Sequence, residues 1–107
     1  MATSPEFVEF IMEQIDGVGE TRYRKMFGEY MVYINDKPIL LVCDDTVFVK
    51  IRDEINDQMQ GAEIGNPYEG AKPHYILDID DRELTKEVIS ILEPITPLPK
   101  PRKKKSK

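Results

Sequence analysis

The chain has 107 residues, of which 40% are hydrophobic and 33% charged, and this length and balance indicate one globular domain. A single cysteine and a single histidine exclude an intrachain disulfide and the usual zinc patterns. No apolar run is long enough to span a membrane and the N-terminus does not have the pattern of a signal peptide, so we expect a cytoplasmic protein without a membrane partner.

The net charge of −5 conceals an asymmetry along the chain. Residues 100–107 hold six basic and no acidic residues, whereas residues 1–99 hold nine basic and twenty acidic ones, a balance of −11. An acidic body disfavours nucleic acid as the partner of the domain itself. Contact with nucleic acid is therefore expected only through the tail Lys100–Lys107, a composition that is also typical of a solvated, disordered terminus. We assign 1–96 to the folded domain and 97–107 to a Pro- and Lys-rich tail.

The first element predicted is a helix over Thr3–Gln14. Thr3 stands three residues before Glu6, the spacing of a capping box. Its buried side is marked by apolar residues at helical spacing: Phe7, Ile11, Ile15 and Val18. Gly17 and Gly19 then favour the end of the helix, because glycine adopts the left-handed capping conformation readily.

The stretch 22–52 predicts an antiparallel meander of four strands. The expected strands are 22–27, 29–34, 39–43 and 47–51. Gly28 allows a bend between the first two strands, and Asn35-Asp36 and Asp44-Asp45-Thr46 are turn sequences. Residues 39–43 are nearly all apolar, which is typical of a central strand buried on both faces. In the last strand Val47, Val49 and Ile51 are expected to point inward, and Phe48 and Lys50 the other way.

The second half of the chain is less regular. A short helix is predicted over 52–60, with Ile55 and Met59 on its buried side. Residues 61–72 contain glycine and proline without an apolar period and predict a loop of a length that is often functional. A strand over 73–79 and a helix that opens at Asp80 follow. The apolar stripe of that helix is Leu84, Val88, Ile91, Leu92 and Ile95, and Pro94 and the prolines after it are expected to end it.

The predicted fold is therefore α+β, a single domain. Its antiparallel sheet has a four-strand meander plus a fifth strand, with helices at both ends packed on it.

The chemistry of the side chains gives little support for catalysis. Cys43 and His74 could form a nucleophile and base, but a lone cysteine in an apolar strand usually behaves as a small hydrophobe. Asp78, Asp80 and Asp81 could bind a metal, but Asp80 is explained more simply as an N-cap. Phosphate-loop and dinucleotide fingerprints are absent from the sequence. We expect no enzymatic activity, no metal and no cofactor.

A run of aromatic and basic residues carries a family resemblance. Arg24-Lys25-Met26-Phe27-Gly28-Glu29-Tyr30, followed by Tyr33, Lys37, Asp44-Asp45 and Val49-Lys50, resembles the N-terminal domain of the TfoX/Sxy family. The resemblance implies a compact α+β domain without established catalytic residues. Larger family members are regulators of natural competence that act with a cyclic-AMP receptor-type activator and carry a helical C-terminal domain. This sequence shows no counterpart of that domain, so we expect a small stand-alone member. It has Glu29 and Met31 where many members have glycine, which disfavours a close backbone approach at that bend.

Besides weak nucleic-acid binding through the basic tail, two hypotheses of function follow. The first is a bacterial regulatory or adaptor domain that contacts a protein in transcriptional regulation, since tyrosine and arginine are favoured anchors of interfaces. The expected surface comprises Arg24, Phe27, Gly28, Glu29, Tyr30 and Tyr33, together with the loop Tyr68–Lys72. The second is a domain that binds a small anionic ligand, with the loop 61–72 as a lid and Lys50, Lys72 and His74 around the anion. The sequence indicates neither the identity of the partner nor the oligomeric state.

Overall fold

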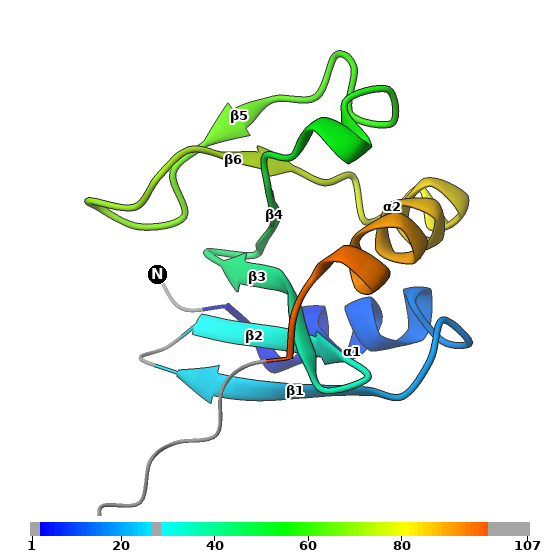
Figure 1. Cartoon of the computed structure of the whole chain (residues 1–107). Coiled ribbons are helices and arrows are strands. Elements are labelled where there is room, and N and C mark those ends of the chain that lie inside the picture. The colour runs from blue at the N-terminus through cyan, green and yellow to red at the C-terminus, as the bar shows by residue number, and fades with distance from the viewer. Residues whose placement is uncertain (1–2, 27–28, 99–107) are drawn as a thin grey trace, which may run out of the picture.

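The chain folds into two α-helices, one short 3₁₀ helix and six strands in a computed structural model that describes residues 3–26 and 29–98 (Figure 1). In chain order these elements are α1 Pro5–Gln14, β1 Thr21–Met26, β2 Glu29–Ile34, β3 Lys37–Cys43, β4 Thr46–Lys50, η1 Asp53–Ile55, β5 Ile64–Gly65, β6 His74–Ile76 and α2 Arg82–Ile95. The predicted α+β class is confirmed. In the part of the chain that the structure describes, no helix has the length and apolar character needed to cross a membrane.

All six strands form one antiparallel sheet in the order β1-β2-β3-β4-β6-β5. The predicted meander is present as β1 to β4, and the predicted fifth strand is β6. The sixth strand was missed: β5 lies in the segment expected to be a loop and pairs Ile64 with Tyr75 of β6. A pairing of two residues leaves no period in the sequence from which it could be predicted.

Two tight turns fix the register of the meander. Asn35 and Asp36 have φ angles of 52° and 68°, and Asp44 and Asp45 have 54° and 55°. These left-handed conformations are those of the two-residue turns whose twist matches that of the flanking strands, and Asn and Asp adopt them at little cost. The predicted turns are confirmed, although Thr46 belongs to β4 rather than to the turn.

The helix caps differ from the prediction by one residue each. Ser4, not Thr3, is the N-cap of α1, and its Oγ accepts a hydrogen bond from the Phe7 amide at 3.2 Å. Thr3 is instead buried, and its Oγ1 accepts from the backbone amide of Asp45 at 3.2 Å. Asp81, not Asp80, caps α2 by accepting from the Leu84 amide at 3.1 Å. In each case two neighbouring polar residues both satisfy the capping pattern, and tertiary contacts decide between them.

Three further boundaries are corrected. The helix predicted over 52–60 is reduced to η1 and the turns that follow it, although Ile55 and Met59 are buried as expected. Ile51 is 44% exposed rather than inward-facing, because β4 ends at Lys50 and the alternation of the strand ends with it. Pro94 lies inside α2, which continues to Ile95.

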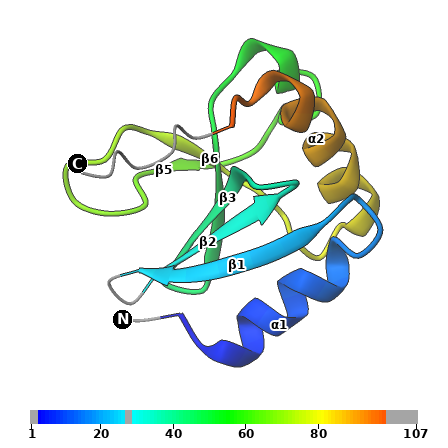
Figure 2. The same ribbon diagram turned by 60° about the horizontal axis from the view of Figure 1, so that its bottom comes forward.

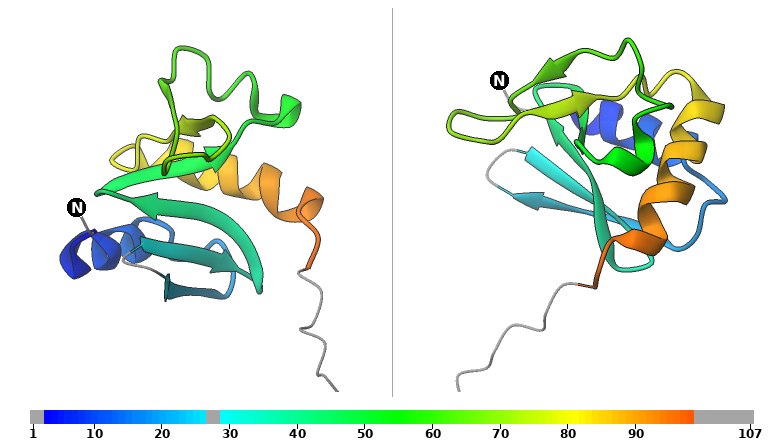
Figure 3. Two further views of the ribbon diagram at one scale, coloured as in Figure 1. Left: turned by 90° about the vertical axis from the view of Figure 1, so that its left-hand side faces the viewer. Right: turned by 45° about the horizontal axis from the view of Figure 1, so that its top comes forward.

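One hydrophobic core joins the helices to the sheet. Its fully buried members include Ile11 of α1, Ile15 at the end of that helix, Val32 of β2, Leu40 of β3 and Ile89 of α2. The end of α1 is held near the start of α2, where the Gln14 side-chain amide donates to the carbonyl of Ile79 at 2.8 Å. The strands separate α1 from residues 96–98, the described residues after α2, as Figures 1 and 2 show together. These residues therefore lie on the side of the sheet away from α1, and the two further views in Figure 3 show the same arrangement.

Candidate functional site

Strand alternation gives the sheet an outer face, opposite the face that carries Val32, Leu40 and Val49. The register aligns Arg24 with Met31, Met31 with Leu41, Leu41 with Phe48 and Phe48 with Ile76, so these side chains form one row across the sheet. Further members of the outer face, from β1, β2, β4 and β6, are Arg22, Tyr33, Lys50 and His74. The row is basic at its β1 end and apolar from Met31 to Ile76.

A groove of about 600 Å³ lies on this outer face. Met31, Leu41 and Phe48 contribute apolar surface from three neighbouring strands. Tyr68 from the segment between β5 and β6 and Leu98 from the segment after α2 also line it, and they are 53% and 62% exposed. Such a volume with mostly apolar walls is in the range of small-molecule sites.

Basic side chains line the same groove. Lys50 of β4 stands directly opposite His74 of β6, and Arg52 lies two residues beyond Lys50. The Nδ1 of His74 lies 2.8 Å from the Lys72 carbonyl, which only accepts, so Nδ1 carries the proton of this hydrogen bond. Arg52 forms an ion pair with Glu54 at 3.4 Å, but both side chains are well exposed and such pairs contribute little. None of the described residues that line the groove is acidic.

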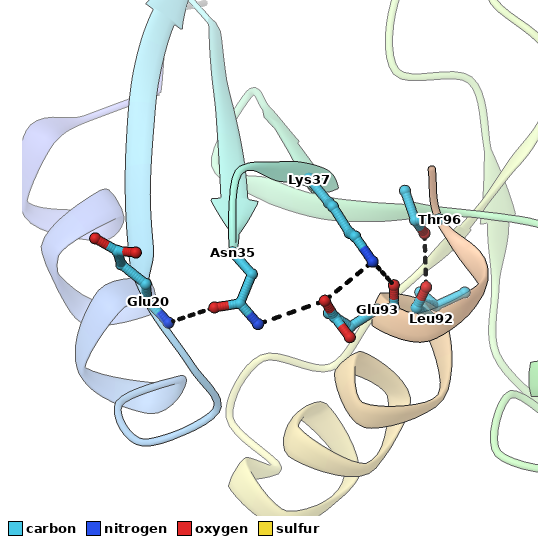
Figure 4. A network of polar contacts seen from close by, with 6 residues as sticks. All are labelled: Glu20, Asn35, Lys37, Leu92, Glu93 and Thr96. Carbon is cyan, nitrogen blue, oxygen red and sulfur yellow. Dashed lines mark hydrogen bonds and ion pairs between the residues drawn. The ribbon is translucent and has the colours of Figure 1, made fainter. Parts of the chain in front are cut away.

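A polar network fixes the end of α2 beside the groove (Figure 4). Lys37 donates through Nζ to the Glu93 carboxylate at 3.1 Å and to the Glu93 carbonyl at 2.9 Å. Asn35 accepts from the Glu20 amide at 2.9 Å and donates to Glu93 at 3.4 Å. The hydrogen bond from Lys37, and then the one from Asn35, lower the pKa of Glu93 against the opposing effect of burial. The network thereby ties the β2–β3 turn to the helix end from which the groove-lining segment Thr96–Leu98 continues.

The edge strand β1 is a second exposed feature. Its residues from Arg22 to Lys25 are all exposed, and three of these four are basic. The guanidinium of Arg22 lies 4.2 Å from the ring centroid of Tyr33, a cation–π contact. Tyr23 is 47% exposed and packs edge-on against Tyr30 with ring centroids 5.6 Å apart. This strand thus presents cations and an aromatic ring at the margin of an otherwise acidic domain.

Among the described residues, β1 pairs with β2 alone, so one side of its backbone has no strand partner there. Asn35 donates its amide to the Glu20 carbonyl at 2.7 Å, which identifies Glu20 and Asn35 as a hydrogen-bonded pair of the ladder. Because such pairs alternate in an antiparallel ladder, the even-numbered residues of β1 bond to β2. The N–H and C=O groups of Tyr23 and Lys25 therefore point away from the sheet.

The structure distributes the expected site residues over several places. Lys50, Tyr68 and His74 come together in the groove, whereas Lys72 contributes its carbonyl to His74 and has an exposed side chain. Arg24 and Tyr33 lie on the outer face of β1 and β2.

The other expected site residues that the structure describes do not contribute to the groove. Tyr30 is only 7% exposed and belongs to the hydrophobic core, on the face opposite Met31, so it is not the surface anchor that we expected. Glu29 is half-buried beside Cys43. Phe27 and Gly28 lie outside the described residues.

Cys43 is a buried thiol rather than a nucleophile. Burial raises its pKa to about 12, and a hydrogen bond to the Glu29 carboxylate and the charges of Glu29 and Asp44 act in the same direction. A thiol with this pKa is protonated at neutral pH and therefore unreactive. In the part of the chain that the structure describes, no group of three or more His, Cys, Asp or Glu residues is arranged to hold a metal ion.

The sequence reasoning missed Met31, Leu41, Arg52 and Leu98 as groove residues. A signal for two of them exists, since strand alternation places Met31 and Leu41 on the face to which Phe48 and Lys50 point. Arg52 and Leu98 follow regular elements, and nothing in their local sequence indicates the direction of their side chains.

Comparison with known proteins agrees with this architecture. The sequence model of the TfoX N-terminal domain matches residues 13–86 of the chain. A protein of Spirochaeta aurantia, described as an uncharacterized 12.7 kDa protein in the trpE 5′ region, is 31% identical over 109 aligned positions that cover 100% of this chain and 95% of that protein. The expected family is thereby confirmed, and the chain belongs to the TfoX N-terminal domain family.

Proposed function

We propose that the chain is a non-enzymatic regulatory adaptor domain that acts in the cytoplasm, in transcriptional regulation, by binding a protein partner along β1. The observation that carries this proposal is the exposed, basic edge strand with outward-pointing backbone groups at Tyr23 and Lys25. Membership of the TfoX N-terminal domain family supports the regulatory part of the proposal.

An edge strand of this kind is suited to strand addition. A partner segment in extended conformation gains main-chain hydrogen bonds from the unpaired groups, while side chains on both faces give selectivity. The other sheet edge, β5, is two residues long and offers a much shorter template. Arg22, Arg24 and Lys25 favour an acidic partner segment, and Tyr23 supplies an aromatic anchor.

A proline substitution tests the backbone contact directly. Lys25→Pro removes an outward-pointing N–H without removing a bond to β2, and Lys25→Ala removes the same charge but keeps the N–H. Each variant carries a photo-crosslinking amino acid at Tyr23, and circular dichroism and urea unfolding verify that both fold. A control protein carries the crosslinker at the exposed Ser90 of α2.

The proposal predicts a specific crosslinked protein from native lysate at Tyr23, retained in Lys25→Ala, lost in Lys25→Pro and absent from the Ser90 control. Gene deletion should change the transcript profile, and Lys25→Ala but not Lys25→Pro should restore it. Equal crosslinking and equal rescue by the two variants would refute binding along the β1 edge.

A further inference from the structure

We propose that the groove on the outer face binds a small amphipathic anion, a molecule with an apolar body and one carboxylate or phosphate group. This site is separate from the β1 edge and does not depend on the function proposed above. The inference rests on the shape of the groove, on its charge and on the way its parts are held.

The apolar part of the groove is built by the sheet itself. Met31, Leu41 and Phe48 are aligned across three strands, so their positions are fixed by the backbone ladder rather than by flexible loops. Tyr68 and Leu98 stand at the groove with more than half of each side chain exposed. A ligand with an apolar body would cover these two side chains, which is a favourable transfer from water.

The charge of the groove is opposite to that of the domain. The chain has 20 acidic residues among 107, yet the described groove lining contains Lys50, Arg52 and His74 and no acid. Lys50 forms no ion pair with any other residue that the structure describes. The ion pair of Arg52 with Glu54 is exposed and therefore weak. The cationic end that Lys50 and Arg52 form is complementary to an anion.

The anion-binding groups are also oriented. The Lys72 carbonyl and the edge-on contact with Phe48, at 6.4 Å between ring centroids and 87° between planes, hold the His74 ring from two sides. Cross-strand pairing holds Lys50 next to it. The ligand would thus place its charged group near Lys50 and Arg52, beside the His74 ring, and its body along Phe48, Leu41 and Met31.

The wall formed by Thr96–Leu98 is anchored by contacts already described. Thr96 donates its hydroxyl to the Leu92 carbonyl at 2.6 Å, and Lys37 holds the preceding turn of α2 through Glu93. Residues 99–107 hold six basic and no acidic residues, so their charge is not complementary to that of Lys50 and Arg52. A small anion is the occupant that satisfies both the apolar and the charged parts.

Four probes with the same alkyl chain length separate the contribution of the charged head group to binding from that of the apolar body. The full chain, labelled with ¹⁵N, is titrated with octanoate, octyl phosphate, octan-1-ol and octyltrimethylammonium, and amide shifts report the site. We expect saturable shifts in Met31, Leu41, Phe48, Lys50 and His74 with octanoate, octyl phosphate or both, and binding of the alcohol and the cation at least tenfold weaker. The stronger of the two anions identifies the head group.

Variants then test the residues. Lys50→Gln and Arg52→Gln should each weaken anion binding about tenfold, as expected for loss of one charge-assisted contact. Lys86→Gln, a change of the same type on α2 outside the groove, should leave it unchanged. Equal binding of octanol and octanoate, absence of binding by both anions, or anion binding that appears only after deletion of 99–107 would each overturn the proposal. Loss of the β1 partner in Lys25→Pro would leave these titrations unaffected.

Discussion

The turn between β2 and β3 provides a sharp test of how the domain is held together. Asn35 combines a left-handed backbone, with φ of 52°, and a side chain that accepts from the Glu20 amide at 2.9 Å. Asn35→Ala removes this hydrogen bond and the longer, exposed one to Glu93 at 3.4 Å, and it places alanine in a conformation that only Gly, Asn and Asp adopt readily. Asn35→Gly removes the same two hydrogen bonds but relieves the backbone.

The magnitudes follow from these two contributions. The hydrogen bond is worth about 1 kcal/mol and the left-handed conformation of alanine costs roughly 1–2 kcal/mol. We therefore expect Asn35→Ala to lower the free energy of unfolding by about 2–3 kcal/mol, and Asn35→Gly by about 1 kcal/mol, the loss of side-chain hydrogen bonding alone. Asp36→Gly is the control, because Asp36 has φ of 68° and its ion pair with Arg22 is exposed on both sides, and its effect should lie within about 0.5 kcal/mol.

Urea unfolding followed by circular dichroism measures all three variants. If Asn35→Ala were no more destabilising than Asn35→Gly, the left-handed turn would not constrain the hairpin. If both were neutral, the hydrogen bond to Glu20 would not hold the hairpin to the segment before β1.

Three further predictions concern the core, the thiol and the polar network. Leu40→Ala should cost about 2–5 kcal/mol because Leu40 is fully buried, whereas Leu98→Ala, at an exposed position, should change the urea midpoint little. Iodoacetamide should not label native Cys43 at pH 8 but should label it in urea, since its pKa is raised to about 12 only in the folded state; rapid native labelling would contradict its burial. Folding lowers the pKa of Glu93, so ionised Glu93 contributes fully to stability above its unfolded-state pKa, and this contribution is lost as pH falls through its folded-state pKa. Glu93→Gln should therefore reduce the dependence of the free energy of unfolding on pH at acid pH. An unchanged dependence would argue against the contact with Lys37.

The sequence predicts the meander well because its signals are local. Alternation in residues 29–34, the apolar run 39–43 and the Asn-Asp and Asp-Asp turns each determine a strand or turn within a few residues. Burial of Ile55 and Met59 also follows from spacing, although the helix around them does not extend as predicted.

The candidate site is harder to predict because it is made by pairing between distant segments. Lys50 and His74 are expected site residues, but only the β4–β6 register places them opposite one another. Tyr30 was wrongly expected to be a surface residue. A tyrosine near basic residues resembles an interface anchor, but the alternation of β2 places this side chain in the core. β5 and the position of Leu98 depend on tertiary contacts that leave no periodic trace.

The measurement that tests the central claim most directly is the comparison of Lys25→Pro with Lys25→Ala in cells that lack the native gene. Binding along the β1 edge predicts that Lys25→Ala restores both the Tyr23 crosslink and the transcript profile, and that Lys25→Pro, folded to the same degree, restores neither. Full restoration by Lys25→Pro would contradict the claim that this strand carries the regulatory contact.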